Sequence, residues 1–378
     1  MKPKKILIVA GEPSGDLHAS NLVKNLKSLN PDIKFFGIGG TLLKKCGVDI
    51  IFDISELALV GVVEVLKNIF TVGKAFKTVL AKADAERPDL AILVDYPGFN
   101  LRLARELKAR SIPVVYYISP QVWAWGRDRV NIIKKCVKKI IVFFKFEEEL
   151  YKTYGVDATF VGHPLLDTVK ATMTKDEVLK MYDLSRGKPV VALLPGSRTL
   201  EVKSFLSVMI SACAIINKSS GGAQFVIAKY EGLRRDLYED AIKSSNLDIR
   251  IADNDTYNIL TAADFAVVAS GTATLETAII GTPFVMIYRV NLLTYMLYKI
   301  VSTTKFIGIV NIIAGKEVVP ELLQYEMTPE NIAAEVLKLM SDEDKKTKML
   351  EGLKRVRASL GTSGASLRAA EEILRLSL

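Results

Sequence analysis

The sequence predicts an α/β protein with two domains, each built on a parallel β-sheet. Short apolar runs recur along the chain, and each is followed by a Gly- or Pro-containing turn and a segment of helical periodicity, which is the pattern of βαβ units. The chain has 378 residues, and a single core rarely grows beyond roughly 250–300 residues. Hydrophobic residues make up 49% of the chain, which is enough for two large cores.

The clearest βαβ unit lies in the second half of the chain. Phe265–Ala269 is long enough for one buried strand, and the Ser270–Thr272 turn follows it. Ala273–Ile280 has good helix formers, and Phe284–Tyr288 is a second apolar run. This order predicts strand, tight turn, helix and strand.

The turn of this unit has the features of an anion site. Gly271 lets the backbone approach a ligand closely, and Ser270 and Thr272 offer hydroxyl groups. The free N–H groups at the helix start, around Ala273, favour a diphosphate. Glu276 lies one turn later, where it can accept hydrogen bonds from a ribose. The alternative is a Ser or Thr helix cap followed by an ordinary surface glutamate.

Charge and cysteine content restrict the class of protein. The formal charge of +9 suits an anionic partner, although a solvated basic surface explains it equally well. Cys46, Cys136 and Cys213 form no CxxC pair, which favours reduced thiols in the cytoplasm. The lysine-rich start is followed by only five apolar residues, Ile6–Ala10, so we expect a strand there and not a signal peptide. No run reaches the roughly 18 consecutive apolar residues of a spanning helix.

The first strand, Ile6–Ala10, leads into a Gly-rich loop, Gly11–Asp16, and a predicted helix, Leu17–Leu29. The loop matches neither GxGxxG nor a phosphate loop ending in Gly-Lys-Ser/Thr, which disfavours a dinucleotide site and an ATPase. A strand over Lys34–Ile38 and a helix from Thr41 follow.

Leu57–Phe76 is apolar on more than one helical face. Val60, Val63 and Phe70 lie off the stripe that would face a core, so the segment is either deeply buried or contacts a membrane. Basic residues could draw this surface to anionic phospholipid head groups. They are Lys67, Lys74, Lys77, Arg127 and the Lys134–Lys139 cluster.

Asp95 follows the predicted strand Leu90–Val94, so it points out of the carboxyl edge of the sheet, where catalysis usually occurs. It could instead cap a helix starting near Asn100. The next strand, Val114–Ile118, precedes a loop with both tryptophans, Trp123 and Trp125.

A second α/β series begins at Val190–Leu194, after a polar connection. The Pro-Gly-Ser-Arg turn that follows places backbone N–H groups at Ser197 and a guanidinium at Arg198, an arrangement suited to a diphosphate. Asp253-Asn-Asp255 resembles the metal motif of some sugar transferases, but Asp255 is better placed as a helix N-cap and no metal-binding cluster accompanies it. Asn311 lies between apolar residues and is expected to be a buried amide that serves a site.

Seven stretches, in order, resemble the lipid A disaccharide synthase family, glycosyltransferase family 19. They are Gly11–Asp16, Val94–Phe99, Ser119–Trp125, Gly162–Pro164, Leu194–Arg198, Ala269–Glu276 and Asn311–Glu317. The resemblance implies the GT-B fold, with two Rossmann-like domains facing a central cleft. It departs from the family at Gly98, where members often carry aspartate, and at Gly126, where they often carry a larger residue.

The resemblance implies an inverting transfer from UDP-2,3-diacylglucosamine to 2,3-diacylglucosamine 1-phosphate, giving a β-1,6-linked disaccharide 1-phosphate and UDP. It implies no metal, no cofactor and no nucleic-acid partner. It implies a cytoplasmic enzyme peripherally attached to the inner face of the inner membrane, and a homodimer is compatible with it. Asp95 matches the family's essential aspartate and is the expected general base, with His18 as the alternative. Arg198 and Asn311 match further residues needed for activity, and Glu276 matches the ribose-binding acid.

We expect residues 1–165 to form an acceptor and membrane-contact domain, and residues 166–350 to form a UDP-sugar donor domain. Residues 351–378 would cross back to the first half or to a partner subunit. Two alternatives stay open. A UDP-GlcNAc 2-epimerase-like enzyme would share the fold but needs no apolar surface. A non-enzymatic lipid-binding protein would explain Leu57–Phe76 but not Arg198 with Glu276.

Overall fold

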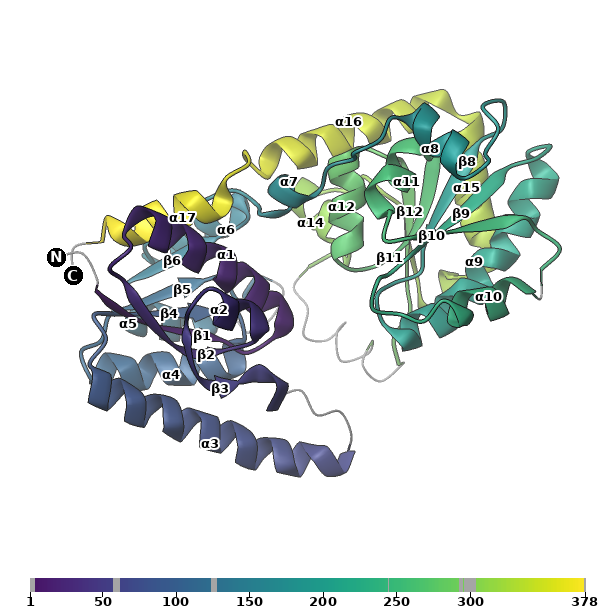
Figure 1. Cartoon of the computed structure of the whole chain (residues 1–378). Coiled ribbons are helices and arrows are strands. Elements are labelled where there is room, and N and C mark those ends of the chain that lie inside the picture. The colour runs from purple at the N-terminus through teal and green to yellow at the C-terminus, as the bar shows by residue number, and fades with distance from the viewer. Residues whose placement is uncertain are drawn as a thin grey trace. The chain divides into compact units, whose positions relative to one another are not determined.

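The computed structural model describes residues 4–56, 62–123, 128–243, 245–291, 295 and 304–376, without the side chains of 62–69. The chain divides into two compact units (Figure 1). The first contains Met1–Pro164 and Leu360–Leu378, and the second contains Leu165–Ser359. The first boundary lies one residue before the expected position, and the chain returns to the first unit only after Ser359.

The first unit is built on a seven-stranded sheet with the order β3-β2-β1-β4-β5-β6-β7. Every neighbouring pair is parallel, and Ile6 of β1 is in register with Leu90 of β4. The strands are β1 (Lys5–Ala10), β2 (Lys34–Gly39), β3 (Asp49–Asp53), β4 (Leu90–Val94), β5 (Val114–Tyr117), β6 (Lys139–Val142) and β7 (Ala158–Phe160). The central strands are apolar on both faces because helices cover both.

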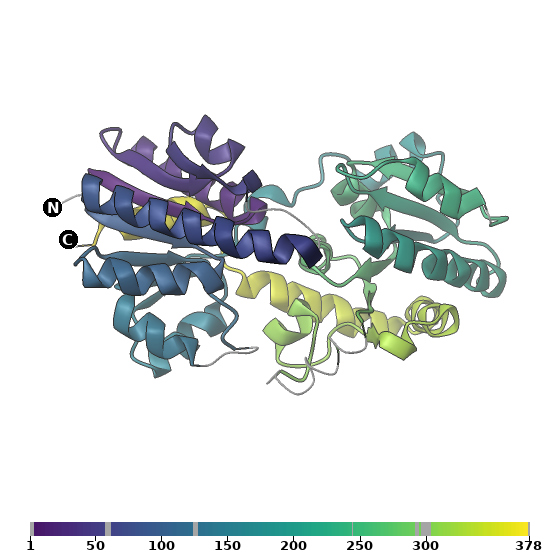
Figure 2. The same cartoon turned by 90° about the horizontal axis from the view of Figure 1, so that it is seen from below.

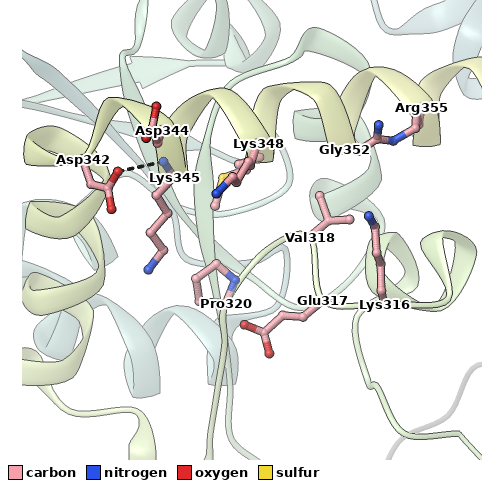
Figure 3. Close-up of a pocket in the computed structure, with 11 residues that line it drawn as sticks. Lys316, Glu317, Val318, Pro320, Asp342, Asp344, Lys345, Lys348, Gly352 and Arg355 are labelled. Carbon is pink, nitrogen blue, oxygen red and sulfur yellow. Dashed lines mark hydrogen bonds between the residues drawn. The ribbon is translucent and has the colours of Figure 1, made fainter.

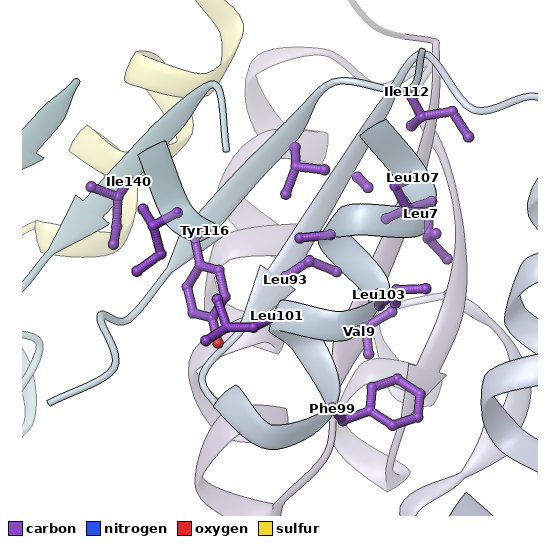
Figure 4. Close-up of a cluster of buried hydrophobic side chains, with 14 of the residues drawn as sticks. Leu7, Val9, Leu93, Phe99, Leu101, Leu103, Leu107, Ile112, Tyr116 and Ile140 are labelled. Carbon is purple, nitrogen blue, oxygen red and sulfur yellow. The ribbon is translucent and has the colours of Figure 1, made fainter. Parts of the chain in front are cut away.

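Helices form one layer on each face of this sheet. One face carries α1 (Pro13–Leu29), α2 (Thr41–Lys45) and the C-terminal helix α17 (Ala365–Leu374). The other carries α3 (Val62–Glu86), α4 (Pro97–Ala109), α5 (Arg129–Cys136) and α6 (Lys145–Thr153), with the long α3 lying across the sheet in Figure 2. Figure 4 shows the core under α4, where Phe99, Leu103 and Leu107 meet Leu7 and Leu93.

The C-terminal helix α17 packs on the first unit through its apolar face and through polar contacts. The Arg368 guanidinium donates to the carbonyl of Val161 (2.8 Å). The Lys139 ammonium lies 3.1 Å from the Glu372 carboxylate, and its side chain is only 12% exposed. Lys139 therefore serves the fold and is not available to a lipid head group, contrary to the expectation for the whole lysine cluster.

The remaining lysines of that cluster lie at the amino edge of the sheet. Lys134 and Lys135 are in the last turn of α5, which leads into β6. With Lys108 and Lys138 they line a cavity of about 430 Å³. The helix α3 begins at the opposite, carboxyl edge, because it follows β3 in a parallel sheet. The single basic and apolar surface expected from the sequence is therefore split between two edges.

The second unit is built on a six-stranded parallel sheet with the order β10-β9-β8-β11-β12-β13. Its strands are β8 (Val190–Leu194), β9 (Gln224–Lys229), β10 (Ile249–Asp253), β11 (Phe265–Ala269), β12 (Phe284–Tyr288) and β13 (Glu321–Leu323). One side carries α9 (Thr199–Ser219), α10 (Asp236–Lys243) and α15 (Pro329–Ser341). The other carries α8 (Lys175–Met181), α11 (Thr256–Ala262), α12 (Thr272–Ile280), α14 (Ile309–Ala314) and α16 (Glu343–Ser359), and α7 (Leu165–Thr168) opens the unit. The two parallel sheets confirm the predicted α/β fold.

Within the described residues, α9 is the one helix that is long and apolar enough to span a membrane by length and composition. No run of consecutive apolar residues reveals this helix in the sequence. The apolar residues of α9 are interrupted by polar ones, and Val202, Phe205 and Met209 are buried within the unit. One side of α9 therefore packs into the core of the second unit.

Two predicted helix starts were wrong. The helix α1 begins at Pro13, inside the predicted Gly11–Asp16 loop, because proline is well suited to a first helical turn. For the same reason α4 begins at Pro97 and not near Asn100. The strand β3 was not predicted. The predictions for Val60, Trp125 and Arg127 lie outside the described residues, and so do the side chains of Val63 and Lys67.

Candidate active site

Both sheets reverse their strand order at one point, and the predicted site residues follow the strands that flank these points. In the first sheet the reversal lies between β1 and β4, so the loops after Ala10 and Val94 are neighbours. In the second it lies between β8 and β11, so the loops after Leu194 and Ala269 are neighbours. The carboxyl edge at such a switch point is where open parallel sheets bind ligands.

In the first unit, Asp95 is held at the switch point by its backbone. Its N–H donates to the Tyr117 carbonyl (3.0 Å). Its own carbonyl accepts from the Tyr116 hydroxyl (2.6 Å) and from the Asn100 amide (2.8 Å). Asp95 and Tyr96 both have φ of +46°, an uncommon conformation for residues other than glycine. These contacts fix the backbone from which the Asp95 side chain projects.

The Asp95 carboxyl has an acidic neighbour, Glu12, which was not among the predicted site residues. Burial raises the pKa of Asp95 above its ordinary value, and the Glu12 carboxylate after β1 raises it further. The Tyr96 ring lies against Gly11, where a Cβ would come within 2.2 Å of a ring carbon. Glu12 belongs to the Gly11–Asp16 stretch that resembles the family, but only the pairing of β1 with β4 brings it near Asp95. A carboxyl with a raised pKa at a sheet edge is well suited to accept a proton.

The alternative base, His18, lies on α1 in an apolar environment. Its ring packs edge-on against Phe143 (5.5 Å between centroids), and His163 packs against the same ring (5.6 Å). Burial lowers the pKa of His18 to about 4 and that of His163 to about 3, so both are neutral at pH 7. The Nδ1 atom of His18 is buried without a partner among the described residues. A pKa this low makes His18 a weaker base than an unperturbed histidine.

Asp16, in the same predicted loop, has a structural role. Its carboxylate accepts hydrogen bonds from the backbone of Gly40 (2.7 Å) and Leu42 (3.0 Å), at the start of α2. It therefore joins the two helices that follow β1 and β2.

In the second unit, the turn after β8 carries Ser197 and Arg198. Gly196 has φ of +114°, which turns the next two N–H groups toward one point. The Glu201 carboxylate occupies that point, at 3.0 Å from Ser197 N and 3.2 Å from Arg198 N. The Arg198 guanidinium is 83% exposed and lies 3.5 Å from the same carboxylate.

The turn after β11 places the other predicted residues. Gly271 is the N-cap of α12 with φ of +154°, and no side chain caps the helix, so neither Ser270 nor Thr272 acts as the expected hydroxyl cap. Thr272 and Ala273 are in the first helical turn, where N–H groups lack intrahelical acceptors. A Cβ on Gly271 would meet nothing within 4 Å. The backbone here is open to a ligand.

Glu276 lies one turn into α12 and is held from α11. The Tyr257 hydroxyl donates to its carboxylate (3.0 Å), and burial raises the pKa of Glu276. Tyr257 was not predicted, because nothing in the sequence indicates that α11 packs beside α12. One carboxylate oxygen of Glu276 is thus oriented by Tyr257, which leaves the other for a ligand hydroxyl.

Asn311 is fully buried on α14, as a buried amide was expected to be. Its Nδ2 donates to the Val319 carbonyl and the Glu321 carboxylate, both at 2.8 Å. Its Oδ1 accepts from Val318 N (2.7 Å) and Val319 N (3.0 Å). All four hydrogen-bonding positions of the amide are therefore used to join α14 to the segment that leads into β13.

The Asp-Asn-Asp stretch is engaged within the fold. Asp253 pairs with Lys229 (3.0 Å) and with Arg235. Asp255 stands at the N-cap of α11, as predicted, but its carboxylate accepts from Tyr182 (2.8 Å) and not from the helix backbone. Across the described part of the chain, no three His, Cys, Asp or Glu side chains are grouped as metal ligands would be.

A cavity of about 610 Å³ lies away from these strand ends. It is formed by α16 and the segment before β13, and Figure 3 shows Lys316, Lys348 and Arg355 along it. Three acidic residues share the lining, Glu317, Asp342 and Asp344. The mixed charges and the position away from the carboxyl edge set this cavity apart from the candidate site.

The sequence matches the family profile described as Lipid-A-disaccharide synthetase over residues 6–373. The chain belongs to the lipid-A-disaccharide synthase family. The lipid-A-disaccharide synthase of Syntrophus aciditrophicus is 46% identical, covering 100% of this chain and 98% of the relative. That of Myxococcus xanthus is 42% identical, covering 99% and 98%. Family membership makes the chain a UDP-sugar glycosyltransferase of lipid A biosynthesis and confirms the resemblance read from the seven motifs.

Solved structures with little sequence similarity share the fold of this synthase. The calicheamicin glycosyltransferase CalG4 has a TM-score of 0.64 and 15% identity, covering 100% of both chains. The UDP-GlcNAc 2-epimerase from Neisseria meningitidis, bound to UDP-GlcNAc, has a TM-score of 0.62 and 12% identity, covering 98% of this chain and 100% of the epimerase. These similarities establish the GT-B fold, and the family match favours the synthase over the epimerase alternative.

Proposed function

We propose that this synthase transfers the diacylglucosaminyl group of UDP-2,3-diacylglucosamine to the 6-hydroxyl of 2,3-diacylglucosamine 1-phosphate, with inversion. The products are the β-1,6-linked tetraacyl-disaccharide 1-phosphate and UDP. One observation supports this most strongly: a carboxyl with a raised pKa, Asp95, lies at one switch point, and anion-binding backbone with Arg198 lies at the other. A sugar transfer from a nucleoside diphosphate requires both a base for the acceptor hydroxyl and groups that bind the diphosphate.

In the proposed mechanism, Asp95 accepts the proton of the acceptor 6-hydroxyl as its oxygen forms a bond to the anomeric carbon of the donor. The bond from that carbon to the diphosphate oxygen breaks, and its electrons leave with UDP. Arg198 and the N–H groups of Ser197 and Thr272 stabilise the added negative charge. Glu276 binds the ribose. The first unit thus binds the acceptor and the second binds the donor, without metal or cofactor.

A UDP-release assay with both lipid substrates tests this proposal. We expect UDP only when donor and acceptor are both present, with no loss in EDTA. Asp95→Asn should reduce turnover by about 10²–10⁴-fold, the contribution of a positioned base, and should leave UDP binding unchanged. Glu351→Gln, an exposed acid on α16, is the matched control and should retain full turnover. Release of UDP from UDP-GlcNAc without acceptor would contradict the proposed reaction. A larger loss of turnover in His18→Ala than in Asp95→Asn would contradict the assignment of Asp95 as the base.

We also propose that the enzyme is cytoplasmic and binds peripherally to the anionic inner face of the inner membrane, where its diacylated substrates reside. Phe70, in the first half of α3, is 80% exposed, which supports a contact there. Phe70→Ser should reduce binding to liposomes containing anionic phospholipid and leave the circular dichroism spectrum unchanged. Unchanged binding would place the contact elsewhere. We further propose a homodimer, for which light scattering should give twice the mass of one chain.

A further inference from the structure

The Glu201 carboxylate occupies the position in the turn after β8 where an anion would be bound. Its Oε2 accepts from both Ser197 N and Arg198 N, at 3.0 and 3.2 Å. It also lies over Gly196, where a Cβ would come within 2.4 Å of the same oxygen. Oε1 is 3.5 Å from the Arg198 guanidinium. One carboxylate therefore contacts both backbone N–H groups and the guanidinium that this turn offers to the proposed donor substrate.

Converging N–H groups beside a guanidinium form the environment that a phosphate oxygen selects in proteins. A carboxylate oxygen carries the same kind of negative charge and accepts the same hydrogen bonds. Two oxyanions cannot share two N–H groups at 3.0–3.2 Å without strong repulsion. A diphosphate can therefore occupy this turn only when the Glu201 carboxylate leaves it.

We propose that Glu201 is an internal substitute for the diphosphate: it holds the turn in its binding shape in the free enzyme and is displaced when the donor binds. This inference rests on the proposed function, because it assigns the diphosphate to the same turn. It makes Glu201 a positioning residue that sets the affinity for the donor and for the UDP product. It also gives the enzyme a built-in competitor that speeds the release of UDP.

A glutamate three residues after a helix N-cap also occurs as an ordinary capping box, in which it stays bound to the backbone and only stabilises the helix. The second unit contains such a case for comparison. Glu177 of α8 accepts from the Thr174 N–H (2.7 Å) and the Thr174 hydroxyl (2.8 Å). Glu177 stands on a different helix from the proposed diphosphate turn, so Glu177→Gln is a matched control for the loss of a capping charge.

The test is calorimetric titration with UDP and with uridine. Glu201→Gln keeps a carbonyl oxygen for the two N–H groups and removes the charge that competes with phosphate. We expect UDP to bind about tenfold more tightly to this variant, the scale of one charge-assisted hydrogen bond. Uridine, which has no phosphate, should bind unchanged. Glu177→Gln should bind both ligands as the wild type does.

The outcomes separate this inference from the proposed function. If the wild type does not bind UDP, both are wrong. If the wild type binds UDP and Arg198→Ala weakens that binding, the donor site stands. Equal or weaker UDP binding by Glu201→Gln, with an unchanged melting temperature, then overturns the displacement of Glu201 alone. Glu201→Ala is a second test. Tighter UDP binding by this variant supports displacement of Glu201. Weaker binding of UDP but not of uridine means that Glu201 stays in place to shape the turn.

Discussion

Replacing Asn311 with alanine should destabilise the second unit strongly, because the side chain is fully buried and makes four hydrogen bonds of 2.7–3.0 Å. The substitution leaves two backbone N–H groups, one carbonyl and one Glu321 oxygen without that partner. Each buried group left unsatisfied costs about 1–3 kcal/mol. Water entering the space recovers part of this, so we expect a loss of roughly 3–5 kcal/mol, at the upper end for a single substitution.

Two spectroscopic signals separate this effect from a change in the first unit. Both tryptophans, Trp123 and Trp125, belong to the first unit, so their fluorescence in urea reports that unit alone. Circular dichroism reports both units. For Asn311→Ala we expect a new early transition by circular dichroism, with the fluorescence midpoint unchanged. Asn331→Ala removes a single exposed amide contact, to the Glu326 carbonyl (2.9 Å), and should change stability by less than about 0.5 kcal/mol.

The same variant decides between a structural and a catalytic role for Asn311. If the amide only joins α14 to β13, the turnover of Asn311→Ala should fall in proportion to the unfolded fraction. It should recover at low temperature or when saturating UDP stabilises the unit. An unchanged unfolding profile together with lost turnover would refute this reasoning and would place the amide in contact with substrate.

Three further variants test the electrostatics. Glu12→Gln removes a negative charge that raises the pKa of Asp95, so the acidic limb of the kcat/KM profile should move to lower pH; an unmoved limb would mean that Glu12 does not act on the base. Tyr257→Phe releases the Glu276 carboxylate and should raise KM for the UDP-sugar about tenfold with kcat little changed; a fall in kcat alone would contradict a ribose-binding role. Burial raises the pKa of Glu147 to about 8 from an ordinary value of 4.5, so the folded state holds a proton that the unfolded state releases, and stability falls as pH rises from 4.5 to about 8. Glu147→Gln should abolish that fall in melting temperature, and an unchanged pH dependence would exclude Glu147 as its source.

The sequence predicted three strands of the second sheet well, β8, β11 and β12, because their short apolar runs are almost completely buried. Phe265–Ala269 and Phe284–Tyr288 agree residue for residue with β11 and β12. The strand β3 was missed because Asp49-Ile-Ile-Phe-Asp53 is short and has an aspartate at each end, and it lies at the edge of its sheet. Local pattern was therefore sufficient for central strands and insufficient for an edge strand.

Site residues were predictable where they follow a strand, and not where they depend on which strands are neighbours. Asp95 and Ser270 directly follow apolar runs, which places them at a carboxyl edge from sequence alone. Glu12 lies near Asp95 only because β1 pairs with β4. In this pair Ile6 is in register with Leu90, which is 84 residues later in the chain. Tyr257 and Glu201 are likewise recognisable only through the side chains they contact. The sequence indicates which residues follow a strand. Which charged side chains become neighbours depends on the order of the strands in the sheet.

The groups of the second unit that are proposed to bind the nucleotide are already held by contacts within the fold. The N–H groups of Ser197 and Arg198 are bonded to Glu201, and one oxygen of the Glu276 carboxylate is oriented by Tyr257. A nucleotide that uses the two N–H groups exchanges hydrogen bonds and does not simply gain them, so the net free energy of each of these two contacts is small. The benefit is a binding surface that is ordered before the ligand arrives. An enzyme of this kind binds its donor moderately and releases UDP readily, which suits a reaction in which the nucleotide must leave after every transfer.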